Sequence, residues 1–310
     1  MGLRESKLHY VLFAFLSVLA VRSASSSSSA AQPTISPDAA AIVCQTHDQP
    51  NPIATTYPNN ATGTLNGTIA VVPITLTLAR QLIPAQYRIL EKAYRALLPS
   101  FPADMYPAIV QSMHDHDVQA SGFSIPDFSR AGIEFPFLDL LGDNSSSFKW
   151  SPSLLMTATN LLAIGGAVAY GTNTFPATFD PSCDAYRAVP NAAAGTTSFS
   201  AKSVISGQAS ASSVFSPTTL EMYPLAFYKN VTNQPMFADG KTCDNMVRLF
   251  NTSVTTAPNK IENVKGTVKV KLPPLTSERE WTNVYGIRLD TAFIENNYLP
   301  CENFRGYSGV

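Results

Sequence analysis

The sequence predicts a β-rich α+β fold, in which many short strands form a closed or sandwiched sheet with helices beside it. Short apolar stretches recur between residues 106 and 272, and turn residues separate them. The chain has 23 Pro and 16 Gly in 310 residues, enough to end many strands. Residues 78–98 have apolar residues roughly at helical spacing. Short strands divided by Pro and Gly are typical of barrels and sandwiches.

The first elements are a strand and a divided helix. Residues 66–79 are expected to form a strand, because Thr68–Val72 is a β-branched run that ends at Pro73. Residues 78–98 place apolar side chains at helical spacing, and Pro84 is expected to split the helix in two.

The rest of the chain is expected to be mostly strand. Candidate strands cover residues 106–116, 132–138, 147–150, 163–170, 197–205, 209–215, 225–228, 246–254 and 264–272. The last of them alternates and places Lys265, Lys269 and Lys271 on one face. Pro273-Pro274 ends it, and we expect no clear strand beyond this point.

The N-terminus has the pattern of a secretory signal. Arg4 and Lys7 precede an apolar run from Tyr10 to Val21, and small residues follow. We expect a signal peptide over residues 1–23, a flexible Ser/Pro/Asn-rich segment over 24–65, and a single β-barrel domain over 66–310. The alternative is a membrane anchor, but the run is shorter than the roughly 20 residues that a spanning helix needs. No stable membrane span is therefore expected.

Sequons and cysteines agree with a secreted, extracellular glycoprotein. Five N-x-Ser/Thr sequons predict glycosylation, at Asn60, Asn66, Asn144, Asn230 and Asn251. Four cysteines allow two disulfides in three connectivities, and we favour Cys44–Cys301 with Cys183–Cys243. Four free thiols are the alternative. With 14% charged residues, a formal net charge of −1 and no basic patch, nucleic acid is not an expected partner.

Five segments occur in the order found in a known enzyme family. They are Ala79–Pro84, Val110–Asp115, Gly132–Phe135, Ala163–Phe179 and Glu262–Leu275. In this order the chain resembles the acetoacetate decarboxylase-like superfamily over most of residues 68–275. The resemblance implies a closed, cone-shaped antiparallel β-barrel with flanking helices around an apolar pocket. It also implies a lyase without a cofactor or metal, whose catalytic lysine forms a Schiff base.

The catalytic residues of that family do not carry over to this chain. Ala177 and Thr178 stand where the family has its lysine pair. Pro73 stands where its pocket arginine is expected. One pocket glutamate maps to about Ile109, and the other falls near Asp127 and Phe128. The amine is essential to that mechanism, because the iminium it forms accepts the carbanion electrons. Either another lysine supplies the amine, or the scaffold has another use.

Lys149 is the first candidate for a relocated amine. It lies between Phe148 and Trp150 on an expected strand, where burial would lower its pKa. The alternative is an outward-facing lysine. Lys202 is the second candidate, with the same alternative.

The other candidates are polar residues on neighbouring strands. Arg130 could hold a substrate carboxylate or form a surface ion pair. Glu134 or His114 could donate the proton. His114 and His116 would share one face of a strand, but no third ligand is evident, so we expect no metal. A structural role for the histidines is the alternative.

These observations predict a decarboxylase-like lyase that acts on a small or polyketide-type keto acid. The alternative is a non-catalytic, secreted β-barrel that binds an apolar small molecule and has lost the Schiff-base lysine. A third, weaker possibility is an extracellular surface protein without a pocket function. The sequence does not determine the oligomeric state.

Overall fold

The computed structural model describes residues 49–256 and 260–307, which belong to one compact unit of the chain. The predicted signal peptide and Cys44 lie outside the described residues. In the part that is described, no helix is long and apolar enough to cross a membrane.

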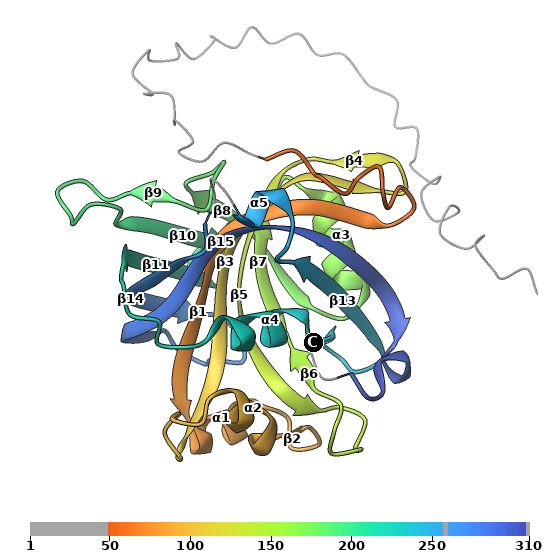
Figure 1. Ribbon diagram of the computed structural model, residues 1–310, viewed down its shortest axis with the longest axis vertical. Helices are drawn as coiled ribbons and strands as arrows, with labels where there is room; N and C mark the ends of the chain where they lie inside the picture. Colours follow the sequence, from red (N-terminus) through yellow and green to blue (C-terminus); the bar gives the residue numbers. More distant parts are fainter. Residues whose placement is uncertain (1–48, 257–259, 308–310) are drawn as a thin grey trace, which may run out of the picture. The chain divides into compact units, whose positions relative to one another are not determined.

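Strand is the predominant regular structure of the described chain (Figure 1). One mixed sheet contains β1 (Ala61–Thr75), β2 (Arg88–Ile89), β3 (Met105–Ala120), β4 (Phe123–Ile125), β5 (Phe128–Asp139), β6 (Phe148–Trp150), β7 (Ser153–Thr157), β8 (Asn173–Asp180), β9 (Arg187–Ala188), β10 (Thr197–Ser203), β11 (Ser210–Pro217), β12 (Met236–Phe237), β13 (Thr242–Leu249), β14 (Glu262–Lys271) and β15 (Arg279–Pro300). The helices are α1 (Leu76–Leu82), α2 (Glu91–Leu97), α3 (Leu161–Ala169), α4 (Leu225–Asn233), α5 (Ser253–Thr256) and the 3₁₀ helix η1 (Cys301–Phe304).

The strand pairings form two circuits that share four strands. The first, which we call circuit A, runs β1–β3–β5–β6–β12–β13–β15 and returns to β1. The second, circuit B, runs β1–β3–β5–β7–β8–β10–β11–β14–β15 and also returns to β1. Neighbours along both circuits are antiparallel, except that β12 pairs with β6 and β7 with β8 in parallel. A shared strand can belong to both circuits because different residues along it pair with different neighbours. On β5, Arg130, Ala131 and Gly132 pair with β7, whereas Phe135 and Leu138 pair with β6.

The core is rich in aromatic residues, which agrees with the apolar composition. Tyr94 of α2 contacts Tyr106 of β3 and Phe137 of β5, with ring centroids 6.0 and 5.9 Å apart. Tyr94 and Tyr106 are fully buried, and each hydroxyl donates to a main-chain carbonyl. Helices α1 and α2 thereby cover one end of the long strands β1 and β3 (Figure 1).

The first strand and the divided helix follow the prediction, but the strand starts earlier than predicted. The predicted helix is divided into α1 and α2, with Pro84 and β2 between them, and Thr75 caps α1 by accepting from the Leu78 N–H. Strand β1 starts at Ala61, so the boundary at residue 65 was placed too late.

Three other predictions were wrong. Residues 163–170 lie mainly in helix α3, because Asn160 caps its first turn by accepting from Ala163 N–H. Residues 225–228 begin helix α4. The longest strand, β15, was missed because its many polar residues interrupt the apolar alternation. A short apolar run cannot be assigned to strand or buried helix by periodicity alone.

The predicted disulfide connectivity is also wrong. Cys243, at the start of β13, is bonded to Cys301 in η1, with Cα atoms 5.0 Å apart. The pairing of Cys243 with Leu299 in the sheet brings the two cysteines together. Cys183 is disulfide-bonded as well. Neither Cys44–Cys301 nor Cys183–Cys243 can therefore form in this fold.

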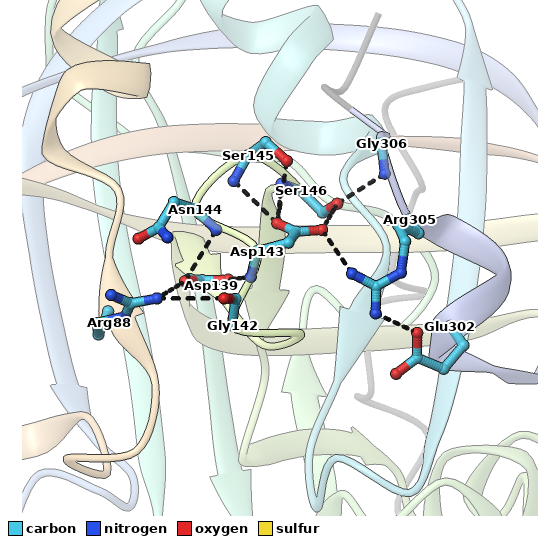
Figure 2. A network of polar contacts seen from close by, with 10 residues as sticks. All are labelled: Arg88, Asp139, Gly142, Asp143, Asn144, Ser145, Ser146, Glu302, Arg305 and Gly306. Carbon is cyan, nitrogen blue, oxygen red and sulfur yellow. Dashed lines mark hydrogen bonds and ion pairs between the residues drawn. The ribbon is translucent and has the colours of Figure 1, made fainter.

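A polar network fixes the loop between β5 and β6 to the C-terminal segment (Figure 2). The Asp143 carboxylate accepts hydrogen bonds from the main-chain N–H groups of Ser145 and Ser146, at 2.9 and 2.8 Å, and from the Ser146 hydroxyl. Arg305 contacts the same carboxylate at 3.3 Å. The hydrogen bonds from Ser146 hold the pKa of Asp143 well below its usual range.

The structure separates the five sequons by accessibility. Asn144 and Asn251 are exposed, and Asn60 and Asn230 are partly exposed. Asn66 is only 3% exposed on β1, and its amide donates to Asp184. A glycan on Asn66 does not fit this fold, so that predicted site is corrected.

Candidate functional site

Charged side chains gather on one face of the strands in circuit A. The register of β3 and β5 puts Gln111 and Asp115 on the same face as Arg130 and Glu134. Gly132, the direct partner of Gln111, has no side chain, and a Cβ atom there would lie 3.0 Å from Cδ1 of Leu154. On this face, each of the two strands thus has two polar residues that lie four positions apart.

Asp115 and Arg130 form a buried ion pair. The Nε and Nη2 atoms of Arg130 donate to the two oxygens of Asp115, at 2.8 and 3.3 Å. The Asp115 side chain is fully buried, and that of Arg130 is 11% exposed. Burial acts to lower the pKa of Arg130, but Asp115 outweighs it and the pKa is raised. Arg130 is thus already occupied by a carboxylate, and its predicted role in holding a substrate carboxylate is not supported by this geometry.

A hydrogen-bonded chain links Glu134 to a residue that the sequence did not single out. Gln111 Nε2 donates to Glu134 Oε2 at 2.5 Å, and Gln111 Oε1 accepts from Arg248 Nη2. All three residues are at least 95% buried. Gln111 therefore bridges the carboxylate and the guanidinium, and it fixes the position of both.

Lys149 lies at the other end of this chain. Its Nζ is 3.4 Å from Glu134 Oε2 and donates to the carbonyl of Thr232, at the end of α4, at 3.2 Å. Burial lowers the pKa of Lys149, Glu134 acts against this, and the charges of Arg248 and Arg130 lower the pKa further. The amine is therefore closer to its neutral, nucleophilic form than an exposed lysine would be.

Arg248 has guanidinium nitrogens that no described residue satisfies. Its side chain is 3% exposed, and its Nε and Nη1 have no hydrogen-bond partner in residues 49–256 and 260–307. Asn233 holds the backbone of Arg248 by two hydrogen bonds, at 2.9 and 3.2 Å. Burial, followed by repulsion from Arg130, lowers the pKa of Arg248 to about 10, so it stays cationic at neutral pH. A buried cation with unused donors is suited to bind an anion.

Two carboxyl groups complete the cluster. Asp244 of β13 is fully buried, and its side chain is hydrogen-bonded to Glu295 of β15. No N–H or O–H group of the described residues donates to either Asp244 oxygen. Burial, followed by the charge of Glu295, raises the pKa of Asp244, and burial also raises that of Glu295. Two carboxylates in contact repel each other, so the pair is expected to keep one proton.

His114 is separated from this cluster. It points to the opposite face of β3, where its Nδ1 lies 3.0 Å from the Ser129 hydroxyl, and it is 3% exposed. Its ring is 6.0 Å from that of His116. In the described part of the chain, no group of three His, Cys, Asp or Glu is arranged to hold a metal ion. The structure thus brings Lys149, Glu134 and Arg130 together and leaves His114 apart.

The positions that correspond to the family's lysine pair lie on a different strand from Lys149. Ala177 is buried and Thr178 exposed, both on β8 of circuit B. Lys202 pairs with Thr178 and is exposed, so it is not part of the buried cluster.

Sequence reasoning missed four polar members of the cluster, Gln111, Asp244, Arg248 and Glu295. The sequence contains only a short pattern that points to them. Asp244 and Arg248 lie four residues apart, so they share one face of β13.

Comparisons with known proteins give remote structural matches. No protein-family model matches the chain, and no curated protein matches it. The chain is similar to the enduracididine biosynthesis enzyme MppR with HEPES buffer bound, at 10% identity and a TM-score of 0.44, over 78% of this chain and 88% of that one. It is also similar to an acetoacetate decarboxylase-like enzyme from Sphingomonas wittichii RW1, at 10% identity and a TM-score of 0.43, over 78% and 93%. Likenesses of this degree bear on neither activity nor substrate.

Proposed function

We propose that the chain is a Schiff-base lyase that decarboxylates a small or polyketide-type keto acid. The observation that carries this proposal is the position of Lys149. It is a buried amine with a lowered pKa, it contacts Glu134, and it shares a cluster with Arg248, whose Nε and Nη1 are unpaired. Lysines made nucleophilic by burial and a neighbouring cation are a known means of forming imines.

The reaction would start at the Lys149 amine. The neutral amine adds to the keto carbonyl carbon, and loss of water leaves an iminium. The bond between the α-carbon and the carboxylate then breaks, CO₂ leaves, and the electron pair moves to the iminium to give an enamine. Protonation of the enamine carbon restores the iminium, and water releases the ketone and the amine. Each step needs only the amine, water and a proton source.

Glu134 and Arg248 have separate roles in this scheme. Glu134 Oε2, at 3.4 Å from Nζ, can take the proton that the ammonium must lose and return it to the departing hydroxyl. Arg248 offers its free N–H groups to the substrate carboxylate and orients it. Gln111 is in contact with both and sets their separation.

Reductive trapping tests the proposal. The native protein is incubated with acetoacetate or a longer β-keto acid and sodium cyanoborohydride, and peptide masses locate any adduct. We expect one adduct, on Lys149, and none in Lys149→Met. Lys202→Met is the matched control, since it removes an exposed lysine from another strand and should leave the adduct unchanged. A folded native protein without any lysine adduct would exclude the mechanism and favour a non-catalytic binding protein.

We also infer that the sheet closes as a cone-shaped barrel and that the protein is secreted as a glycoprotein. The two circuits of paired strands support closure of the sheet. The Cys243–Cys301 disulfide supports folding in an oxidising compartment, as expected for a secreted protein. N-terminal sequencing and glycopeptide analysis of the protein from culture medium would test secretion. Residues 1–23 should be absent, and glycans should occur on Asn144 and Asn251 but not on Asn66.

A further inference from the structure

Strands β13 and β15 of circuit A contain a pair of carboxyl groups that the scheme above does not use. Asp244 is fully buried on β13, whereas Glu295 of β15 is partly exposed. Asn297 and Tyr298 lie two and three positions further along β15, and Tyr298 is 46% exposed. The pair therefore extends from the interior of the cluster towards solvent.

A β-bulge sets the position of Asp244. Cys243 pairs with Leu299 and Asn245 with Asn296, so Asp244 alone lies opposite two residues of β15. Tyr298, one of those two, has a φ of 58°, in the left-handed region that non-glycine residues rarely adopt. Bulges change the direction of side chains and are common beside active sites. This one accompanies the contact between Asp244 and the Glu295 carboxyl.

The sheet register puts Asp244 on the same face as the reactive lysine. Met236 of β12 is the Cα partner of both Lys149 on β6 and Asp244 on β13. The backbones of Lys149 and Asp244 are therefore two strand spacings apart, a distance of about 10 Å. A small substrate joined to Lys149 Nζ would lie within this span.

The charges of the cluster balance when the pair holds one proton. Arg130, Arg248 and protonated Lys149 are three cations, while Asp115, Glu134 and the pair with one shared proton are three anions. The groups that act electrostatically on the pair come from several elements: Asp115 of β3, Arg130 of β5, Lys149 of β6, Tyr170 after α3, and Asn297 and Tyr298 of β15. A second ionisation would leave an uncompensated charge among them.

We propose that the Asp244–Glu295 pair supplies the proton that the enamine carbon takes, with Asp244 as the donor and Glu295 as its link to solvent. The inference rests on the proposed Schiff-base function. In this step the Asp244 O–H bond breaks, the C=C electron pair of the enamine forms the new C–H bond, and the nitrogen lone pair forms the C=N bond of the iminium. Asp244 is left as a carboxylate beside Glu295, and water returns the proton through the partly exposed Glu295.

The test separates proton supply from imine formation. Asp244→Asn and Glu295→Gln keep the shape of each side chain and remove the shared proton. Glu280→Gln is the matched control, because it changes an exposed glutamate of the same strand. We expect both variants to form the cyanoborohydride adduct on Lys149 as the native protein does. Their turnover of a β-keto acid should fall by about 10²-fold, the lower range for loss of a general acid.

Two further measurements distinguish proton supply from a structural role. The alkaline limb of the kcat–pH profile should shift in Glu295→Gln, which keeps Asp244, and should stay in place in Glu280→Gln. In the infrared spectrum at neutral pH, a protonated carboxylic acid band should be present in the native protein and absent from Asp244→Asn. Unchanged turnover and pH profile in both variants, or a native protein without that band, would overturn the inference. If the native protein forms no adduct, the proposed function itself is wrong and the inference falls with it.

Discussion

The buried ion pair of Asp115 and Arg130 gives a direct test of how the cluster is held together. Asp115→Asn keeps the size of the side chain and one acceptor oxygen, but it removes the only carboxylate that contacts Arg130 at hydrogen-bonding distance in the described chain. Arg130, with 11% exposure, then loses its direct ion-pair partner. Only the more distant charges of Glu295 and Glu134 still favour its charged form, against those of Arg248 and Lys149. Breaking a buried pair in this way costs about 3–5 kcal/mol.

Thermal and urea unfolding would measure this cost. For a domain of this size, roughly 2–4 °C of Tm is lost per kcal/mol, so a decrease of about 6–20 °C is expected. The control is Glu280→Gln, which breaks the Lys269–Glu280 contact of 3.2 Å. Both of its side chains are nearly half exposed, so the loss should stay below about 1 kcal/mol.

A double variant tests the reasoning further. Asp115→Asn combined with Arg130→Met removes both charges and leaves an apolar side chain near Met246, which already contacts Arg130. It should recover most of the stability lost by Asp115→Asn alone, because the uncompensated charge is gone. The reasoning is refuted if Asp115→Asn unfolds within about 1 kcal/mol of the native protein.

Three other predictions concern stability and its dependence on pH. The pKa of Asp143 is lower in the folded state than in the unfolded state. The Asp143 carboxylate therefore stabilises the fold above an unfolded pKa of about 3.9, and this stabilisation is lost as the pH falls towards the folded pKa. Asp143→Ala should destabilise the protein at neutral pH and make its stability depend less on pH in acid unfolding experiments. The pKa of Asp244 is raised, so the folded state is progressively disfavoured as the pH rises above about 3.9; in urea titrations, Asp244→Asn should reduce this loss of stability. Replacing Cys243 and Cys301 together by Ala should lower the free energy of unfolding by about 2–5 kcal/mol, measured in urea against the oxidised native protein. An unchanged urea midpoint would show that the sheet alone holds the start of β13 in place.

Local patterns in the sequence were sufficient for several parts of the fold. The apolar stretches around β3, β5, β10, β11 and β14 are close to the observed strands, and Pro84 divides the first helical region as expected. These features depend on alternation, spacing and turn residues that lie within a few positions of one another. Lys149 could also be singled out in this way, because its aromatic neighbours on a short strand indicate burial.

Contacts between distant segments decided the rest. Arg248 and Gln111 are 137 residues apart, and Met246 faces Glu295 only through the pairing of β13 with β15. Arg130 carries the same charge in the sequence as Arg248, yet only the fold shows that one is paired with Asp115 and that the other has free donors. Whether a charge is compensated depends on which strands are brought together, and strand pairing is not contained in the local pattern of either strand. Local patterns are thus enough to predict a strand-rich fold and a candidate amine, but the partner of each charge depends on which strands lie side by side.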